Sequence, residues 1–225
     1  MNIIGPDTLV FGVDDVDACA RYLVGYGLKP VSTDEWGQRF EALDGTGVVL
    51  FHQDDPMLPP SLGTASMLRK TVYGVDNGVT LEAIAHELKR DREVRRLPNG
   101  SLETVDDMGC LLGFQVSVRR PVRLAEAALP RSLSNALCFV PDAARAEAFY
   151  VERLGFVCTD RPLGAGSILR PGGTDKRGTW NEVDCSCRPA GAGNQPGSAG
   201  ERGAAEGEQL HGVPCGRHQN DRTRL

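Results

Sequence analysis

The same order of residue types begins three times along this chain of 225 residues. Each time, an apolar segment ends in a valine, an aspartate or asparagine follows within two positions, and an amphipathic segment comes next. The three valines, Val13, Val75 and Val140, are 62 and 65 residues apart. Because a repeat of this length marks a supersecondary unit used several times, the chain is expected to fold into tandem modules.

The first repeat has the local signals of one strand, one helix and three further strands. Residues 7–13 alternate in hydrophobicity, which is typical of a half-buried strand. Asp14-Asp15 offers a carboxylate that can cap a helix over Val16–Tyr26, and Gly27 provides its end. Three extended segments follow, at 29–33, 38–43 and 48–52. This order defines a βαβββ module.

The second and third repeats show the same order of elements. In the second we expect a strand at 71–75, a helix at Leu81–Lys89, and strands at 92–97, 101–105 and 111–118. In the third we expect a strand at 136–140, a helix at Ala143–Leu154, and strands at 157–161 and 167–169. No fourth strand is evident after these. The sequence therefore predicts an α+β fold of tandem βαβββ modules, with paired N-terminal modules and an incomplete third module.

The domain boundaries follow from this pattern. We predict a paired domain at 1–118, a linker at 119–132, an incomplete third module at 133–174 and a disordered or out-of-frame tail at 175–225. From Lys176 onward there is no Ile, Phe, Tyr or Met, so the tail has little apolar surface to offset its chain entropy. A module without its last strand would expose a sheet edge. We expect that edge to lower solubility or to pair two copies as a homo-oligomer.

Charge and composition exclude several classes of partner. The net charge of −5 and the pI near 5.4 argue against nucleic acid. No apolar run is long enough to span a bilayer and no secretory signal is evident, so a cytoplasmic protein without a membrane partner is expected. The seven cysteines show no spacing that predicts a disulfide framework or a zinc site.

Residues 140–156, VPDAARAEAFYVERLGF, resemble the helix-bearing signature of the vicinal-oxygen-chelate superfamily. This superfamily contains glyoxalases, bleomycin-resistance proteins and extradiol dioxygenases. Paired modules followed by a linker and further modules resemble the type I extradiol dioxygenases most. The resemblance implies an oxidoreductase of aromatic catabolism that cleaves catechol-type rings. It also implies Fe(II) held by two histidines and a glutamate, which leave open positions for the diol and dioxygen.

The residues at the ligand positions implied by the resemblance do not match that set. Asn135 occupies the first histidine position on the opening strand of the third module. In the first two modules the opening strands carry Thr8 and Lys70, and the closing strands carry Val49 and Gly113. An asparagine is a weak ligand, and a lysine repels a cation. We therefore predict no catalytic, cofactor-binding or metal-binding residue, and no cofactor in this chain.

Other histidines and acidic pairs have simpler interpretations than a site. His52 is expected in a solvated loop at a strand end, and His86 on a helix surface. His211, Cys215 and His218 fall in the predicted tail. Two functions stay open: an inactive relative of an Fe(II) extradiol dioxygenase, or a metal-free structural or binding module whose groove holds a small apolar or aromatic ligand. A glyoxalase-type lyase or isomerase is a weaker third alternative.

Overall fold

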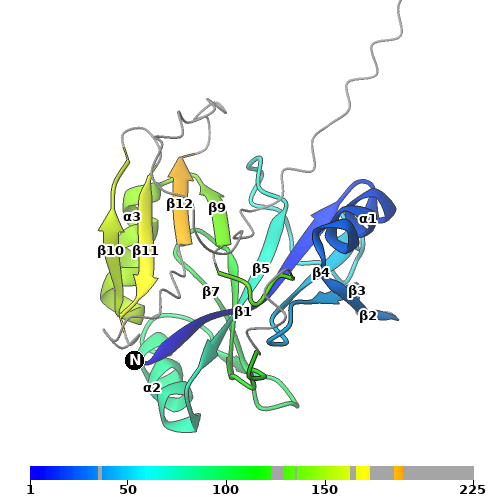
Figure 1. Cartoon of the computed structure of the whole chain (residues 1–225). Coiled ribbons are helices and arrows are strands. Elements are labelled where there is room, and N and C mark those ends of the chain that lie inside the picture. Colours follow the sequence, from blue (N-terminus) through cyan, green and yellow to red (C-terminus); the bar gives the residue numbers. More distant parts are fainter. Residues whose placement is uncertain (35–36, 123–128, 135, 163–165, 173–184, 190–225) are drawn as a thin grey trace, which may run out of the picture.

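The computed structural model describes residues 1–34, 37–122, 129–134, 136–162, 166–172 and 185–189 (Figure 1). The first module consists of β1 (Ile3–Val13), α1 (Val16–Tyr26), β2 (Lys29–Asp34), β3 (Gly37–Glu41) and β4 (Gly47–His52). The second consists of β5 (Leu68–Val75), α2 (Gly78–Leu88), β6 (Arg95–Arg96), β7 (Leu102–Val105) and β8 (Leu111–Val116). The third consists of β9 (Ala136–Val140), α3 (Ala143–Ala148), the π-helical turn η2 (Phe149–Arg153), β10 (Phe156–Asp160), β11 (Ser167–Pro171) and β12 (Cys185–Pro189).

Each helix begins at a side-chain cap in an equivalent place of its repeat. The side chains of Asp15, Asn77 and Asp142 accept hydrogen bonds from backbone N–H groups three residues further on. Gly27 ends α1 in the left-handed conformation, with φ of 104°. Helix α2 begins three residues before the predicted start because its cap is Asn77. The three repeats inferred from the sequence are thus confirmed as structural units.

The first two modules share one eight-stranded sheet, in the order β2-β3-β4-β1-β5-β8-β7-β6. Within each module the first strand pairs in parallel with the last, β1 with β4 and β5 with β8. Strands β1 and β5 join the modules in antiparallel pairing, which relates them by an approximate twofold axis. The predicted α+β fold with paired N-terminal βαβββ modules is confirmed.

The third module has a fourth strand, contrary to expectation. Strand β12 pairs in parallel with β9 and antiparallel with β11, in a four-stranded sheet of order β10-β11-β12-β9. The expectation of disorder is therefore wrong for residues 185–189. Their sequence, Cys-Ser-Cys-Arg-Pro, has no large aliphatic residue, and backbone pairing on both sides makes it a strand. The rest of the predicted tail lies outside the described residues.

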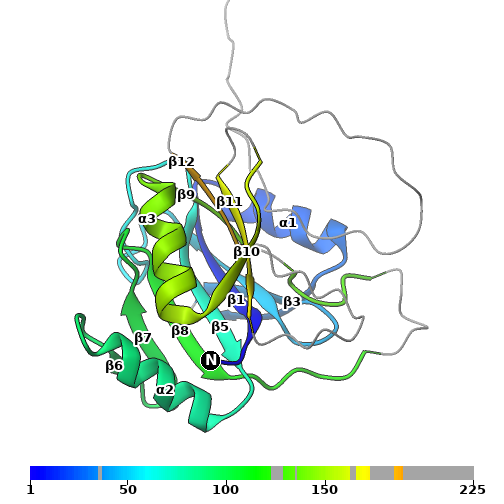
Figure 2. The same cartoon turned by 90° about the vertical axis from the view of Figure 1, so that its left-hand side faces the viewer.

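The third module packs against the second through a shared apolar core. Tyr73 of β5 stacks on Phe114 and meets Tyr150 and Phe156 edge to face, with ring centroids 5.6–6.4 Å apart. The helical segment of α3 and η2 covers its own small sheet and lies near α2 (Figure 2). Arg153 of η2 completes the contact with ion pairs to Glu87 and Asp91 on the second module, both at 2.6 Å.

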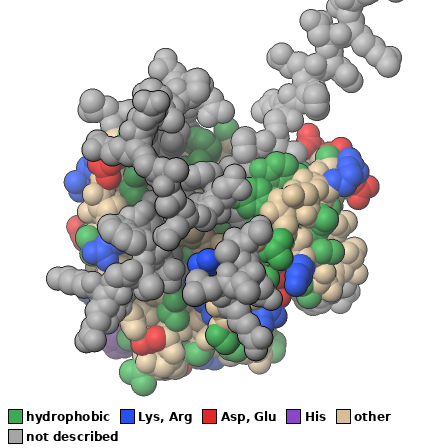
Figure 3. Space-filling view, viewed as in Figure 1, with side chains coloured by type: hydrophobic (Ala, Val, Ile, Leu, Met, Phe, Trp, Pro, Cys, Tyr) green, Lys and Arg blue, Asp and Glu red, His purple; other side chains and the backbone are tan. Residues whose placement is uncertain are grey.

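The surface of the described residues carries mixed charges. On the face seen in Figure 3, lysine and arginine side chains lie dispersed among acidic and apolar ones. Within the described ranges, no helix is both long and apolar enough to cross a membrane.

Candidate functional site

The four ligand positions of the paired modules lie together on one face of the central strands. Val49 stands opposite Val10, which stands opposite Lys70 on the neighbouring strand. In the adjacent row, Thr8 stands opposite Val72, which stands opposite Gly113. The strand registers therefore bring Thr8, Val49, Lys70 and Gly113 close together. Asn135, the corresponding position of the third module, lies outside the described residues.

In both modules, the side chain of the opening-strand position forms a hydrogen bond with the residue that stands opposite the closing-strand position. The Thr8 hydroxyl accepts a hydrogen bond from Arg39 Nη1 at 3.2 Å, and Arg39 stands opposite Val49. The Lys70 ammonium donates to Glu103 Oε1 at 2.5 Å, and Glu103 stands opposite Gly113. Thr8 is thus held by the residue that stands opposite Val49, and Lys70 by the residue that stands opposite Gly113.

These residues do not fit a divalent metal ion. Valine and glycine side chains supply no donor, and two cationic side chains, Arg39 and Lys70, point to the places where an ion would need anionic or imidazole ligands. The carboxylate of Glu103 lies beside Lys70, and it forms ion pairs with Lys70 and Arg95. Nowhere in the described part of the chain do three or more His, Cys, Asp or Glu side chains gather as an ion would require.

Glu103 is held in its ionised form. Burial alone would raise its pKa, but hydrogen bonds from Lys70 and Arg95 and the charges of both outweigh burial, so the pKa lies below its usual value. An ionised Glu103 fixes the Lys70 ammonium beside β8. The ion pair is therefore a main polar interaction of the second module at this position.

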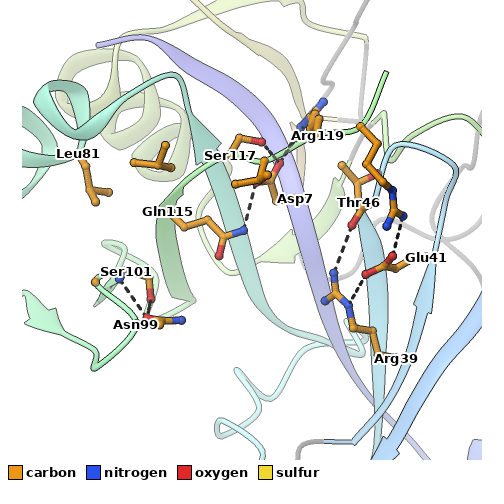
Figure 4. Close-up of a pocket in the computed structure, with 15 residues that line it drawn as sticks. Asp7, Arg39, Glu41, Thr46, Leu81, Asn99, Ser101, Gln115, Ser117 and Arg119 are labelled. Carbon is orange, nitrogen blue, oxygen red and sulfur yellow. Dashed lines mark hydrogen bonds and ion pairs between the residues drawn. The ribbon is translucent and has the colours of Figure 1, made fainter. Parts of the chain in front are cut away.

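A polar cavity of about 490 Å³ opens beside Arg39, and both N-terminal modules line it (Figure 4). Its centre is Asp7 on β1, whose side chain is only 5% exposed. The Asp7 carboxylate accepts hydrogen bonds from Gln115 Nε2 at 3.2 Å, Ser117 Oγ at 3.0 Å and Arg119 Nε at 3.1 Å. Gly74 makes room for it, since a Cβ there would lie 2.5 Å from a carboxylate oxygen.

The opposite wall of the cavity carries a second carboxylate between two arginines. Glu41 of β3 accepts hydrogen bonds from Arg39 Nε at 3.0 Å and Arg120 Nη2 at 2.8 Å. Burial of Glu41 would raise its pKa, but these two guanidinium groups outweigh burial and lower it. Both carboxylates of the cavity are therefore engaged by cationic side chains, which they hold in place.

The cavity lining has one more positive than negative charge. Three arginines, at 39, 119 and 120, face the carboxylates of Asp7 and Glu41. Hydroxyl and amide groups make up most of the remaining polar lining, and no aromatic ring borders it among the described residues. The lining can therefore bind a small polar molecule with an anionic group, and its apolar part comes from aliphatic side chains, Leu81, Val116 and Val118.

The sequence did not identify this cavity. Asp7 was predicted as the first residue of a strand, and Arg119 and Arg120 were assigned to a linker. One signal was available: an aspartate at the start of an otherwise apolar strand requires a partner if it is buried. The partners come from more than one hundred residues away, with separations of 108 to 112. Local pattern could not place them.

The histidines interpreted as surface residues are exposed where the structure describes them. His52 ends β4, and its Nδ1 accepts a hydrogen bond from the Asp54 N–H at 3.3 Å. His86 lies on the exposed side of α2. His211, Cys215 and His218 lie outside the described residues. The described histidines are therefore apart from the cavity.

No protein-family model and no curated protein matches the sequence. Several solved structures do match the fold. The Mn(II)-bound glyoxalase from Novosphingobium aromaticivorans matches with a TM-score of 0.62 and 18% identity, over 84% of this chain and 62% of that chain. The 2,3-dioxygenase LapB from Pseudomonas sp. KL28 matches with a TM-score of 0.61 and 16% identity, over 84% and 71%.

A third similar structure is the homoprotocatechuate 2,3-dioxygenase from Arthrobacter globiformis. Its TM-score is 0.58 at 18% identity, over 84% of this chain and 60% of that chain. This chain therefore spans less than two thirds of the length of the glyoxalase and of this dioxygenase. Similarity at this level of identity shows a shared fold, while the residues of the site must be judged from this chain alone.

Proposed function

We propose a metal-independent binding function, because the implied ligand positions of the paired modules, Thr8, Val49, Lys70 and Gly113, offer a divalent ion no good ligand and Lys70 is paired with Glu103. The ligand is a small, polar molecule with a carboxylate or phosphate group. It binds in the cavity around Asp7 and contacts the guanidinium groups of Arg39, Arg119 and Arg120. The observation that carries the proposal is the excess of positioned guanidinium groups over carboxylates in this cavity.

The arginines retain hydrogen-bonding capacity for an anion. A guanidinium group has five N–H donors in a fixed plane. Arg39 uses Nε, Nη1 and Nη2 for one hydrogen bond each, to Glu41, Thr8 and the Gly45 carbonyl oxygen. Each of its terminal nitrogens has a second N–H for which the described residues provide no further partner. Such prepositioned donors bind planar carboxylates and phosphates well.

Binding of a small anion provides the direct test. Isothermal titration calorimetry with inorganic phosphate, succinate and citrate should give saturable binding to the full chain. Arg120→Gln removes a half-exposed guanidinium whose described bonds go to Leu43 and Glu41, so the fold should persist. A lost charge-assisted hydrogen bond should weaken binding about tenfold or more.

The matched control is Arg21→Gln, which removes an exposed arginine of α1 outside the cavity. It changes the net charge of the chain equally, so it should leave the dissociation constant unchanged. Equal weakening by both variants would indicate a nonspecific charge effect. That result, or no saturable binding of any of the three anions, would contradict the proposal.

An Fe(II)-dependent extradiol dioxygenase is the second candidate, since two of the similar structures are described as dioxygenases. The side chains argue against this candidate, because the Lys70 ammonium and the Glu103 carboxylate are paired with each other and do not serve as metal ligands. Anaerobic reconstitution with Fe(II), followed by metal analysis and assay with catechol, tests it. We expect no stoichiometric iron and no ring cleavage. Retained iron together with a yellow product from catechol would favour this candidate. Retained iron with a different product would favour a metal-dependent glyoxalase-type activity.

A further inference from the structure

Two thiol groups from different modules meet at the interface between the second and third modules. Cys110 directly precedes β8, and Cys138 is the central residue of β9. Their Sγ atoms are 3.5 Å apart, although the residues are separated by 28 positions. Both cysteines are reduced in this structure. The interface of two modules therefore contains a close pair of thiols.

The backbone of Cys110 is fixed on the side of the second module. Its N–H donates to the Asp106 carboxylate at 2.8 Å, and its carbonyl accepts from the Asp106 N–H at 2.9 Å. The same carboxylate accepts a hydrogen bond from the Tyr150 hydroxyl of the third module at 3.4 Å. Cys110 is thus held by a turn that also contacts the third module.

Cys138 is fixed on the side of the third module. Its strand pairs with β12, and its side chain is only 7% exposed. Cys110 is more accessible, and both thiols border a narrow gap that Arg69 and Lys70 also line. A small oxidant can therefore reach Cys110 first.

We propose that Cys110 and Cys138 are a redox site that closes as a disulfide and fastens the third module to the second. Disulfide sulfur atoms lie about 2.05 Å apart, so the two Sγ atoms must approach by roughly 1.5 Å. Rotation of the two side chains can provide most of this approach. The linker at 119–132 lies between the two cysteines, so the bond would close it into a loop.

The oxidant is a hydroperoxide such as hydrogen peroxide. The Cys110 thiolate attacks one peroxide oxygen, the O–O bond breaks, and protonated hydroxide leaves as water, which gives a sulfenic acid. The Cys138 sulfur then attacks the Cys110 sulfur, and the S–O bond breaks with release of a second water. In total, two thiols and one hydrogen peroxide give one disulfide and two waters.

Peptide mapping of the oxidised full chain tests the site. The native protein is treated with hydrogen peroxide, the remaining thiols are blocked, and nonreducing digestion is followed by mass spectrometry. We expect a linked peptide pair joining Cys110 to Cys138 within one chain, which dithiothreitol separates. Native protein with Cys110 oxidised to sulfinic acid and no link to Cys138, or linked instead to another cysteine, would overturn the proposal.

Two variants identify the consequence of the bond. In Cys138→Ser, Cys110 should react with dimedone after peroxide, because its sulfenic acid has no partner thiol. Cys158→Ser is the control, since Cys158 lies on β10 and should not alter the linkage. Peroxide should raise the urea midpoint of unfolding for the native chain and for Cys158→Ser, and not for Cys138→Ser. An equal rise in all three would contradict a stabilising bond at this position.

Discussion

Lys70 of β5 and Glu103 of β7 form an ion pair, with 2.5 Å between Nζ and Oε1. Both side chains are largely buried, with 19% and 8% of their surface exposed. Arg95 is the second partner of Glu103. The pair links β5 to β7 across β8, so it stabilises the sheet of the second module.

Lys70→Met should destabilise the protein. The substitution leaves Glu103 with Arg95 as its remaining cationic partner, and a largely buried carboxylate that loses a partner costs about 1–3 kcal/mol. Urea unfolding of Lys70→Met and of the double variant Lys70→Met with Glu103→Leu measures this. The double variant should recover part of the loss, since no carboxylate remains buried. A single variant as stable as the native chain would contradict the role given to the pair.

Acid should remove the stability contributed by Glu103. Its pKa in the folded chain is below the usual value of 4.5, so the unfolded chain binds the proton first as pH falls. The contribution is fully present above pH 4.5 and is lost as pH falls through the folded pKa. Urea unfolding between pH 3 and 7 should show a smaller loss on acidification for Glu103→Gln than for the native chain. Parallel curves would contradict the lowered pKa.

The Asp106 carboxyl group should have the opposite effect: its contribution to stability should decrease as pH rises. Burial raises the pKa of its carboxyl group, despite hydrogen bonds from the Cys110 and Met108 N–H groups. Its stabilising contribution is therefore complete below the unfolded pKa and is lost as pH rises through the folded pKa. Asp106→Asn keeps an oxygen acceptor without a charge, so its stability relative to the native chain should increase as pH rises. Urea unfolding of both proteins, at pH values from below to well above the usual aspartate pKa, measures the difference in the free energy of unfolding.

Gly74→Ala should displace the Asp7 carboxylate in the polar cavity and destabilise the sheet. A Cβ at this position would lie 2.5–2.7 Å from the Asp7 carboxylate, which cannot withdraw without losing Arg119. We expect a loss of about 1–3 kcal/mol, together with weaker anion binding. Gly25→Ala is the control: no atom outside its own helix and chain neighbours lies within 4 Å, and alanine should stabilise α1 by about 0.5–1 kcal/mol. Thermal unfolding of both variants distinguishes the two positions.

The outer edge of β9 should pair with β9 of a second copy. Among the described residues no strand covers this edge, whereas the equivalent edges of β1 and β5 pair with each other. Antiparallel pairing of two β9 strands would repeat that arrangement. Phe139→Lys, on the partly exposed side of β9, should reduce a concentration-dependent dimer in analytical ultracentrifugation. Val157→Lys on the far edge strand β10 is the control, and a native monomer at all concentrations would contradict this pairing.

Local sequence patterns predicted the parts of the fold that depend on neighbouring residues. The caps Asp15 and Asp142 and the terminal Gly27 were recognised because each acts within its own helix. Strand β12 was missed because its residues lack apolar alternation and it forms through pairing with β9 and β11. Backbone pairing partners cannot be identified from one strand alone.

The candidate site was less predictable than the fold. The strand registers bring Thr8 and Lys70 close to Val49 and Gly113, the positions that the resemblance singled out. The resemblance could not indicate that Lys70 would meet Glu103, since the two residues are 33 positions apart. The contacts of Asp7 with the segment after β8 depend in the same way on the complete sheet.

The position of Val75 has a consequence for circular permutation of the paired modules. Val75 on β5 stands between Ile3 on one side and Val116 on the other. Neighbouring strands are about 4.8 Å apart, so the two ends of the paired modules lie roughly 10 Å from each other. In a shortened chain that ends after β8 and omits the third module, a short peptide would connect these two ends, and new termini in the exposed turn after β4 would give a circular permutant that keeps every strand pairing of the large sheet.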